Sequence, residues 1–145
     1  MSDERRDAAV EALLDRTAVA DVLYRYASTI DRKDYAGLRA VFVDDARGRY
    51  GTRPWVEGAD ALVAWITEQG QDKAWQHHLL TVYHVDVEGD TARALTYHTS
   101  HQARTAEPER VRQIVARYHD ELRRTAEGWR IASKEMEVLW REDRG

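Results

Sequence analysis

Apolar residues in the first third of the chain recur at steps of three and four positions. The repeat runs from Val10 to Ile30, and this spacing predicts an amphipathic helix. Asp15 or Thr17 could cap a restart, so the segment is either one long helix or two helices in series. A second, short helix is expected over residues 33–42, and a third over residues 58–70.

The pattern changes to alternation in the second half of the chain. Residues 76–88 and 91–103 are rich in Val, Tyr and Thr, and they predict two strands joined by a tight turn at residues 88–90. Residues 129–140 alternate as well, and a short strand is expected over residues 45–50. In the segment 129–140, the predicted shared face comprises Ala132, Lys134, Met136, Val138 and Trp140.

One segment fits two structures. Residues 110–124 suit a helix by their charge pattern, but their apolar positions do not decide between the two periods. The order is therefore helices first, followed by three or four long antiparallel strands. This order predicts an α+β fold in which helices pack on one face of a curved sheet.

Composition excludes several classes of function. The 145 residues include no cysteine, which rules out disulfides, thiolate zinc sites and cysteine nucleophiles. The net charge is −4 and no basic block occurs, so the electrostatic footprint of a nucleic-acid-binding protein is missing. No apolar run could span a membrane, and the charged N-terminus has no signal-peptide core. We expect residues 1–145 to form a single cytoplasmic domain.

The adjacent residues His77 and His78 are the first candidates for chemistry. Successive side chains on a strand point to opposite faces, so one histidine faces the helices. That histidine is either a hydrogen-bonded core residue or a general base. Asp31, at the end of the first helix, is either solvated or orients this imidazole.

Other polar residues lie on faces expected to be packed. Tyr26 lies on the apolar stripe of the first helix, and Tyr50 ends the short strand. His98 and His101 have opposite parity on their strand, so at most one faces inward. Lys134 shares an apolar face, where an amine either extends to solvent or occupies a cavity with a lowered pKa. No metal-binding, phosphate-binding or serine-nucleophile motif is present.

At this point the chain resembles the SnoaL-like branch of the nuclear transport factor 2-like superfamily. The resemblance covers about residues 10–140 and is carried by "YASTIDRKDYAGLRAVFVDDA", "EGADALVAW", "QHHLLTVYHVDVEGDTARALTYHTSH" and "ARYHDELRRTAEGWRIASKEMEVLW". It implies a cone: a strongly curved mixed sheet around a pocket closed by the helices. It also implies that residues 110–124 form a strand.

The resemblance implies a site as well. The chain is similar to three kinds of lyase in this branch, namely scytalone dehydratase, bile acid 7α-dehydratase and hexachlorocyclohexane dehydrochlorinase. These pair an aspartate with a histidine, and the matching positions here are Asp31 and His77. Supporting residues then fall at Tyr26, Tyr50, Lys134, and at or near His101. Scytalone dehydratase has serine and asparagine where Ala116 and Tyr118 stand, which separates this chain from that enzyme.

The expected function is a dehydratase that acts on a small hydrophobic or aromatic, polyketide-like substrate without cofactor or metal. His77 would abstract a proton, and Asp31 would orient it. Two alternatives remain: an isomerase or cyclase that uses the same dyad, and a non-catalytic ligand-binding or dimerisation module. A homodimer or homotrimer is expected, with neither nucleic acid nor membrane as partner.

Overall fold

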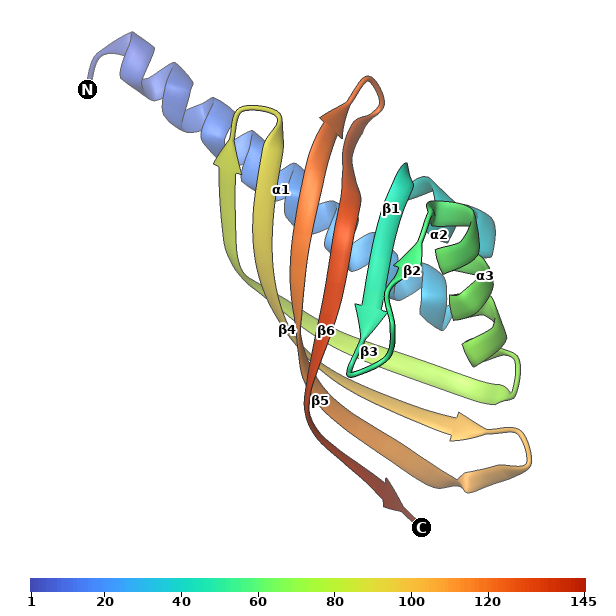
Figure 1. Cartoon of the computed structure of the whole chain (residues 1–145). Helices are drawn as coiled ribbons and strands as arrows, with labels where there is room; N and C mark the ends of the chain where they lie inside the picture. The colour runs from blue at the N-terminus through green and yellow to red at the C-terminus, as the bar shows by residue number, and fades with distance from the viewer.

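The computed structural model describes residues 1–145 and contains three helices and six strands (Figure 1). The first helix is unbroken, with no restart at Asp15 or Thr17. Instead Ser2 caps it, because its side-chain oxygen accepts the N–H of Arg5. The helices are α1 (Asp3–Asp31), α2 (Tyr35–Ala40) and α3 (Ala59–Gly70); the strands are β1 (Phe42–Tyr50), β2 (Val56–Glu57), β3 (Lys73–Glu88), β4 (Thr91–Arg104), β5 (Glu107–Thr125) and β6 (Gly128–Arg144).

The strands form one curved, unclosed sheet in the order β2-β1-β6-β5-β4-β3. The β1–β6 pair is parallel and all other neighbours are antiparallel. Gly89 and Gly128, with φ of 60° and 103°, form the turns of two of the hairpins. The predicted α+β fold with helices packed on a curved mixed sheet is therefore confirmed.

The ambiguous segment 110–124 is part of β5, as the family resemblance implied. Its charges make ion pairs across strands and not along a helix. Arg112 binds Asp143, and Arg117 binds Glu137, both on β6. Opposite charges across an antiparallel ladder stabilise the pairing, which accounts for a charge pattern that suggested a helix.

The predicted apolar face of β6 ends before Trp140. Val115 lies opposite Trp140 while Ala116 lies opposite Val138, so Leu139 is an extra residue in a β-bulge. The bulge reverses the alternation, and Trp140 lies on the outer face of the sheet. The expectation that Trp140 shares the face of Met136 is therefore wrong.

The hydrophobic core lies between the concave face of the sheet and the helices. Eighteen buried residues form it. Helix α1 contributes one stripe, α2 contributes one position and α3 contributes three, and the strands contribute inward-facing side chains. Representative members are Val19, Leu23, Leu38, Phe42, Leu62 and Ile131. No helix combines the length and apolar character needed to cross a membrane.

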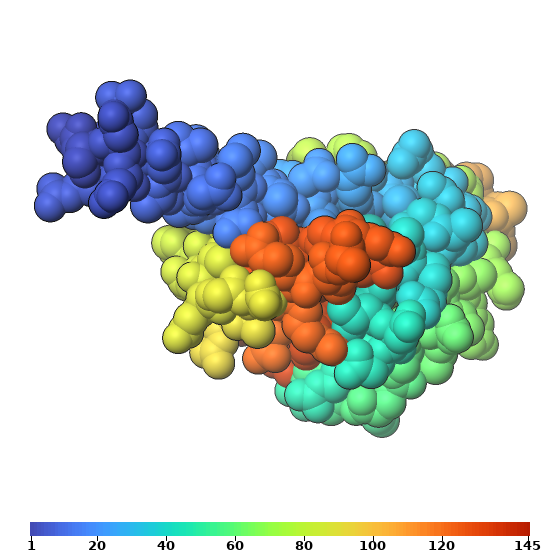
Figure 2. All heavy atoms as spheres, turned by 90° about the horizontal axis from the view of Figure 1, so that it is seen from above, coloured from blue at the N-terminus to red at the C-terminus, as the bar shows by residue number.

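Helix α1 serves the fold mainly through its C-terminal half. Its buried residues begin at Val19, whereas Leu13 and Leu14 are more than half exposed. Figure 2 shows the N-terminal turns extending beyond the body of the molecule. The C-terminal half lies along β3, an edge strand, where the hydroxyl of Tyr24 accepts the N–H of Val82. This packing places the end of α1 against the start of β3.

Candidate functional site

The inner wall of the site follows from strand register. Residues directly opposite one another in a ladder share a face of the sheet. His78 on β3 lies opposite Ser100 on β4, and Leu80 lies opposite His98. Tyr118 on β5 lies opposite Met136 on β6, which in turn lies opposite Tyr50 on β1. These rows bring His78, His98, Tyr118 and Tyr50 to the concave face.

Asp31 and His78 form a closely held pair. The carboxylate oxygen Oδ1 of Asp31 lies 2.5 Å from Nδ1 of His78, and Oδ2 accepts the backbone N–H of His78 at 2.9 Å. Both side chains are largely buried, with exposed fractions of 18% and 12%. An ionised carboxylate only accepts hydrogen bonds, so Nδ1 of His78 is the donor, and Nε2 is the nitrogen that can take up a proton when the ring acts as a base. This is the arrangement of a base and its orienting group.

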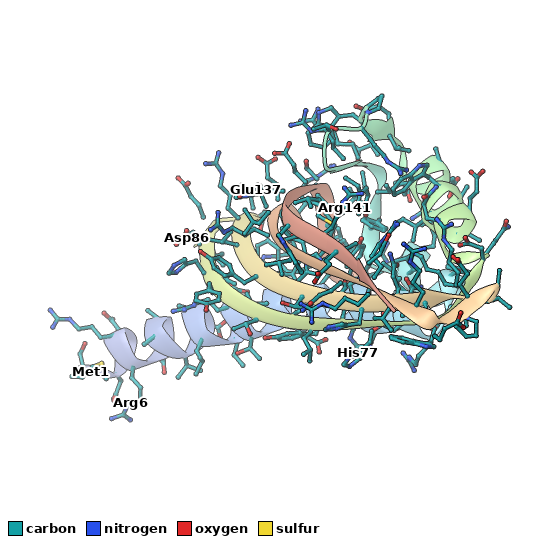
Figure 3. The ribbon with its side chains drawn as sticks, turned by 90° about the horizontal axis from the view of Figure 1, so that it is seen from below. Met1, Arg6, His77, Asp86, Glu137 and Arg141 are labelled. Atoms are coloured by element: carbon teal, nitrogen blue, oxygen red, sulfur yellow. The ribbon has the colours of Figure 1, made fainter.

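The predicted partner of Asp31 is therefore wrong by one position. His77 lies on the outer face of β3, where it is exposed, and it does not contact Asp31. Figure 3 shows its side chain on the convex side of the sheet. His101 lies directly opposite His77 and shares this outer face, so it too is outside the site. The alternation of β3 requires this result once His78 faces Asp31.

His98 is the second histidine of the concave face. Its ring stacks on Tyr118, with centroids 4.4 Å apart, and lies 5.6 Å from the ring of His78. Burial, together with the charges of the nearby His78 and Lys134, lowers the pKa of His98 to about 3. His98 is therefore neutral over the physiological range, and its Nδ1 has no hydrogen-bond partner.

Three tyrosines lie together at the inner end of the site. The hydroxyls of Tyr26 and Tyr50 are 2.6 Å apart, and the ring of Tyr118 packs edge-on against Tyr26 at 5.7 Å. Burial raises the pKa of all three phenols, so each keeps its proton. Tyr26 and Tyr50 are thus brought together as a hydrogen-bonded pair in which one hydroxyl donates to the other, and the second hydroxyl proton can be donated to an oxygen in the cavity.

Lys134 is buried behind these phenols and does not extend to solvent. Its Nζ lies 2.8 Å from Oδ1 of Asp120 and about 4 Å from the ring centroids of Tyr118 and Tyr26 (4.0 and 4.2 Å). Burial lowers the pKa of Lys134 and raises that of Asp120, and the attraction between the two groups opposes both shifts. Lys134 borders the phenol rings and does not line the cavity.

The polar groups open onto a cavity of about 560 Å³. This volume is within the range of small-molecule sites. The apolar part of its wall comes from α1, α3, β5 and β6, and Trp65 stacks on Tyr50 there with centroids 4.8 Å apart. No group of three or more His, Asp or Glu side chains in residues 1–145 is arranged to hold a metal ion. The apolar lining residues are Ile30, Trp65, Ile66, Ile114, Met136 and Val138.

The sequence left the choice between His98 and His101 open, and it did not identify Tyr118 as a member of the site. His98 alternates with Thr96 and Ser100 on β4, and all three are buried. That parity was the available signal, because a polar row on a buried strand face indicates a cavity or a hydrogen-bond network. For Tyr118, the sequence indicated only that this position differs from scytalone dehydratase, and it gave no sign of a role in the site.

Known proteins share this fold and this length of chain. A structure of a candidate aromatic ring hydroxylase from Novosphingobium aromaticivorans is 26% identical, with a TM-score of 0.84 over 91% of this chain and 94% of that one. A candidate scytalone dehydratase from the same organism is 18% identical, with a TM-score of 0.84 over 92% and 90%. The type 3 hexachlorocyclohexane dehydrochlorinase of Novosphingobium barchaimii is 14% identical, with a TM-score of 0.84 over 94% of each chain. The last two likenesses concern the fold alone.

Sequence comparison identifies the family. An uncharacterised protein of Mycobacterium tuberculosis is 26% identical over 129 residues, which is 88% of each chain. The model of the SnoaL-like domain matches residues 11–135. This match covers most of the chain, including Asp31 and His78. The protein therefore belongs to the SnoaL-like domain family, within the nuclear transport factor 2-like superfamily.

Proposed function

We propose that this protein is a cofactor-independent lyase, a dehydratase, that acts on a small hydrophobic ring compound. The observation that carries the proposal is the Asp31–His78 pair at the wall of a cavity. Its 2.5 Å contact is a short hydrogen bond between a base and its orienting group. An apolar wall with a few convergent polar groups suits a ring-shaped substrate of modest size.

The reaction begins with proton removal. His78 takes a proton from a carbon beside an electron-withdrawing group, and Asp31 stabilises the imidazolium that forms. The electron pair of the broken C–H bond becomes a C=C bond as the neighbouring C–O bond breaks. The departing oxygen receives a proton from the Tyr26–Tyr50 pair and leaves as water. Proton return from His78 to the phenol pair, through the released water, restores the starting state.

Lys134 acts in this scheme as a positioning residue. Its ammonium group lies beneath two phenol rings, where it favours electron density on their oxygens by electrostatics. Asp120 holds the ammonium in place from the other side. Lys134 therefore tunes the proton donors without contact with the substrate.

The test compares three single variants in an elimination assay on a panel of hydroxylated ring compounds. Asp31→Asn and His78→Gln are expected to lower turnover at least about 100-fold, since the first removes the carboxylate that orients the base and the second removes the base itself. His77→Gln is the matched control, because it removes the adjacent histidine on the opposite face. Turnover is followed by loss of water from the product mass, and circular dichroism checks the fold.

The outcomes separate this mechanism from its competitors. Full turnover in His78→Gln would overturn the dyad mechanism. A product of unchanged mass that depends on His78 would indicate an isomerase or cyclase. The observation that favours this alternative is a second imidazole, His98, whose ring is stacked 5.6 Å from that of His78. Ligand binding without turnover in the wild-type protein would indicate a binding module.

The outer face of the sheet supports an assembly of identical subunits. Exposed apolar side chains gather on β3, β4 and β6, and a patch of this kind on a sheet is typical of an interface. We propose that a second copy of the chain covers it in a homodimer or homotrimer. The residues are Trp75, Leu79, Tyr83, Tyr97 and Trp140.

A further inference from the structure

The mouth of the cavity carries an arginine whose position follows from the β-bulge in β6. Arg141 lies opposite Ile114, which lies opposite Ser100, which lies opposite His78. The four residues form one row across the concave face, and all line the cavity. Without the extra residue at Leu139, Arg141 would have the opposite parity and would lie on the outer face.

Most acidic groups at this mouth are already engaged. Asp143 accepts two hydrogen bonds from Arg112, at 2.7 and 3.0 Å. Asp72 pairs with Arg104 at 3.3 Å, and Glu107 pairs with Arg110 at 3.8 Å. The remaining acid that lines the cavity is Glu68, an exposed residue of α3.

Three cations at the mouth have no carboxylate within 4.0 Å: Arg141, Lys73 and Arg53. The guanidinium of Arg53 lies over the ring of Trp65, 5.5 Å from its centroid, and Lys73 borders Gln76. Positive charge therefore exceeds unpaired negative charge at the entrance. The guanidinium of Arg141 keeps its planar set of donors free, and such a fork matches a carboxylate.

We propose that Arg141 is a specificity-determining residue and that the substrate is a ring compound with a carboxylate at the end remote from its reacting carbon. The proposal rests on the proposed function, because it takes His78 as the base that lies next to the reacting carbon of the substrate. Three strand spacings separate the two residues, roughly 14 Å along the sheet and less across its concave side. Two or three fused rings with a terminal carboxylate span such a gap.

The test measures binding of 6-hydroxy-2-naphthoate and of 2-naphthol by isothermal titration calorimetry at low salt. The first compound is the anionic probe and the second is its neutral counterpart. The wild-type protein is expected to bind the naphthoate at least tenfold more tightly. Arg141→Gln should remove this preference and leave the affinity for 2-naphthol unchanged. Arg16→Gln, which alters net charge equally on the exposed side of α1, should keep the preference.

Several results would overturn the inference. Equal affinity for the two probes would do so, as would an Arg141→Gln variant that loses both probes equally, or absence of binding by either probe. The same titration in His78→Gln separates the inference from the proposed function. A preserved naphthoate preference in this variant supports the anion site whether or not the wild-type protein catalyses elimination.

Discussion

His98 links the site to the pH dependence of stability. Its pKa in the folded protein is about 3, compared with an ordinary value of 6.5. The unfolded chain therefore binds a proton at this residue between those values, while the folded chain does not. Stability from a neutral His98 is fully present above about pH 6.5 and is lost as the pH falls toward 3.

We predict that His98→Phe makes the protein less sensitive to acid. The substitution keeps a flat ring against Tyr118 and removes the titrating group. Between about pH 7 and pH 5, the free energy of unfolding of the wild-type protein should fall by about 2 kcal/mol more than that of the variant. Urea denaturation at the two pH values measures this difference. His77→Gln should behave as the wild-type protein, and equal slopes for wild type and His98→Phe would contradict the prediction.

At the scale of secondary-structure elements, the features that could be predicted are those that depend only on the periodic spacing of apolar residues. The three helices, the long strands and the hairpin turns follow from spacings of apolar residues and from glycine. The faces of the strands do not follow so easily. Moving the register by one residue exchanges His77 for His78, and the sequence "QHHLL" contains no signal that separates them.

The bulge in β6 shows the same limit. Clean alternation from Ala132 to Val138 predicts that Trp140 continues the inner face, but the extra residue Leu139 reverses it. A bulge depends on how a strand fits its neighbour, here β5, and no local pattern records that fit. The positions of Arg141 and Trp140 could therefore be assigned only once the two strands were paired.

The complete set of site residues could be identified only from the fold of the whole molecule. Asp31, Tyr26 and Tyr50 could be nominated from one segment each, because each has a neighbouring apolar or turn pattern. The contact of Lys134 with Asp120, and the stack of His98 on Tyr118, join residues on different strands of the sheet. Such pairs depend on both the curvature of the sheet and the register of its strands, and neither can be predicted from a single sequence.

At the scale of the whole molecule we predict that the chain is an oligomer held by the outer face of the sheet. Leu79 is 59% exposed and lies in a row with Thr99, Val115 and Trp140. Leu79→Glu should convert a dimer or trimer into a monomer of 16.8 kDa, measured by multi-angle light scattering. A buried charge without a partner opposes association.

The control for this experiment uses the free end of α1. Leu13 is also exposed, at 63%, but it lies on the projecting turns and not on the sheet. Leu13→Glu should leave the oligomer intact. A wild-type protein of monomer mass, or an assembly lost in Leu13→Glu and kept in Leu79→Glu, would contradict the assignment of the interface.

The contact between Asp31 and the backbone of β3 has a consequence for solubility. β3 is an edge strand, and unpaired N–H groups on such a strand invite pairing with another chain. Oδ2 of Asp31 occupies one of these groups, the N–H of His78. Asp31→Asn can keep this bond through its amide oxygen, whereas Asp31→Ala frees the N–H. We therefore expect Asp31→Ala, and not Asp31→Asn, to aggregate faster on incubation, as followed by light scattering.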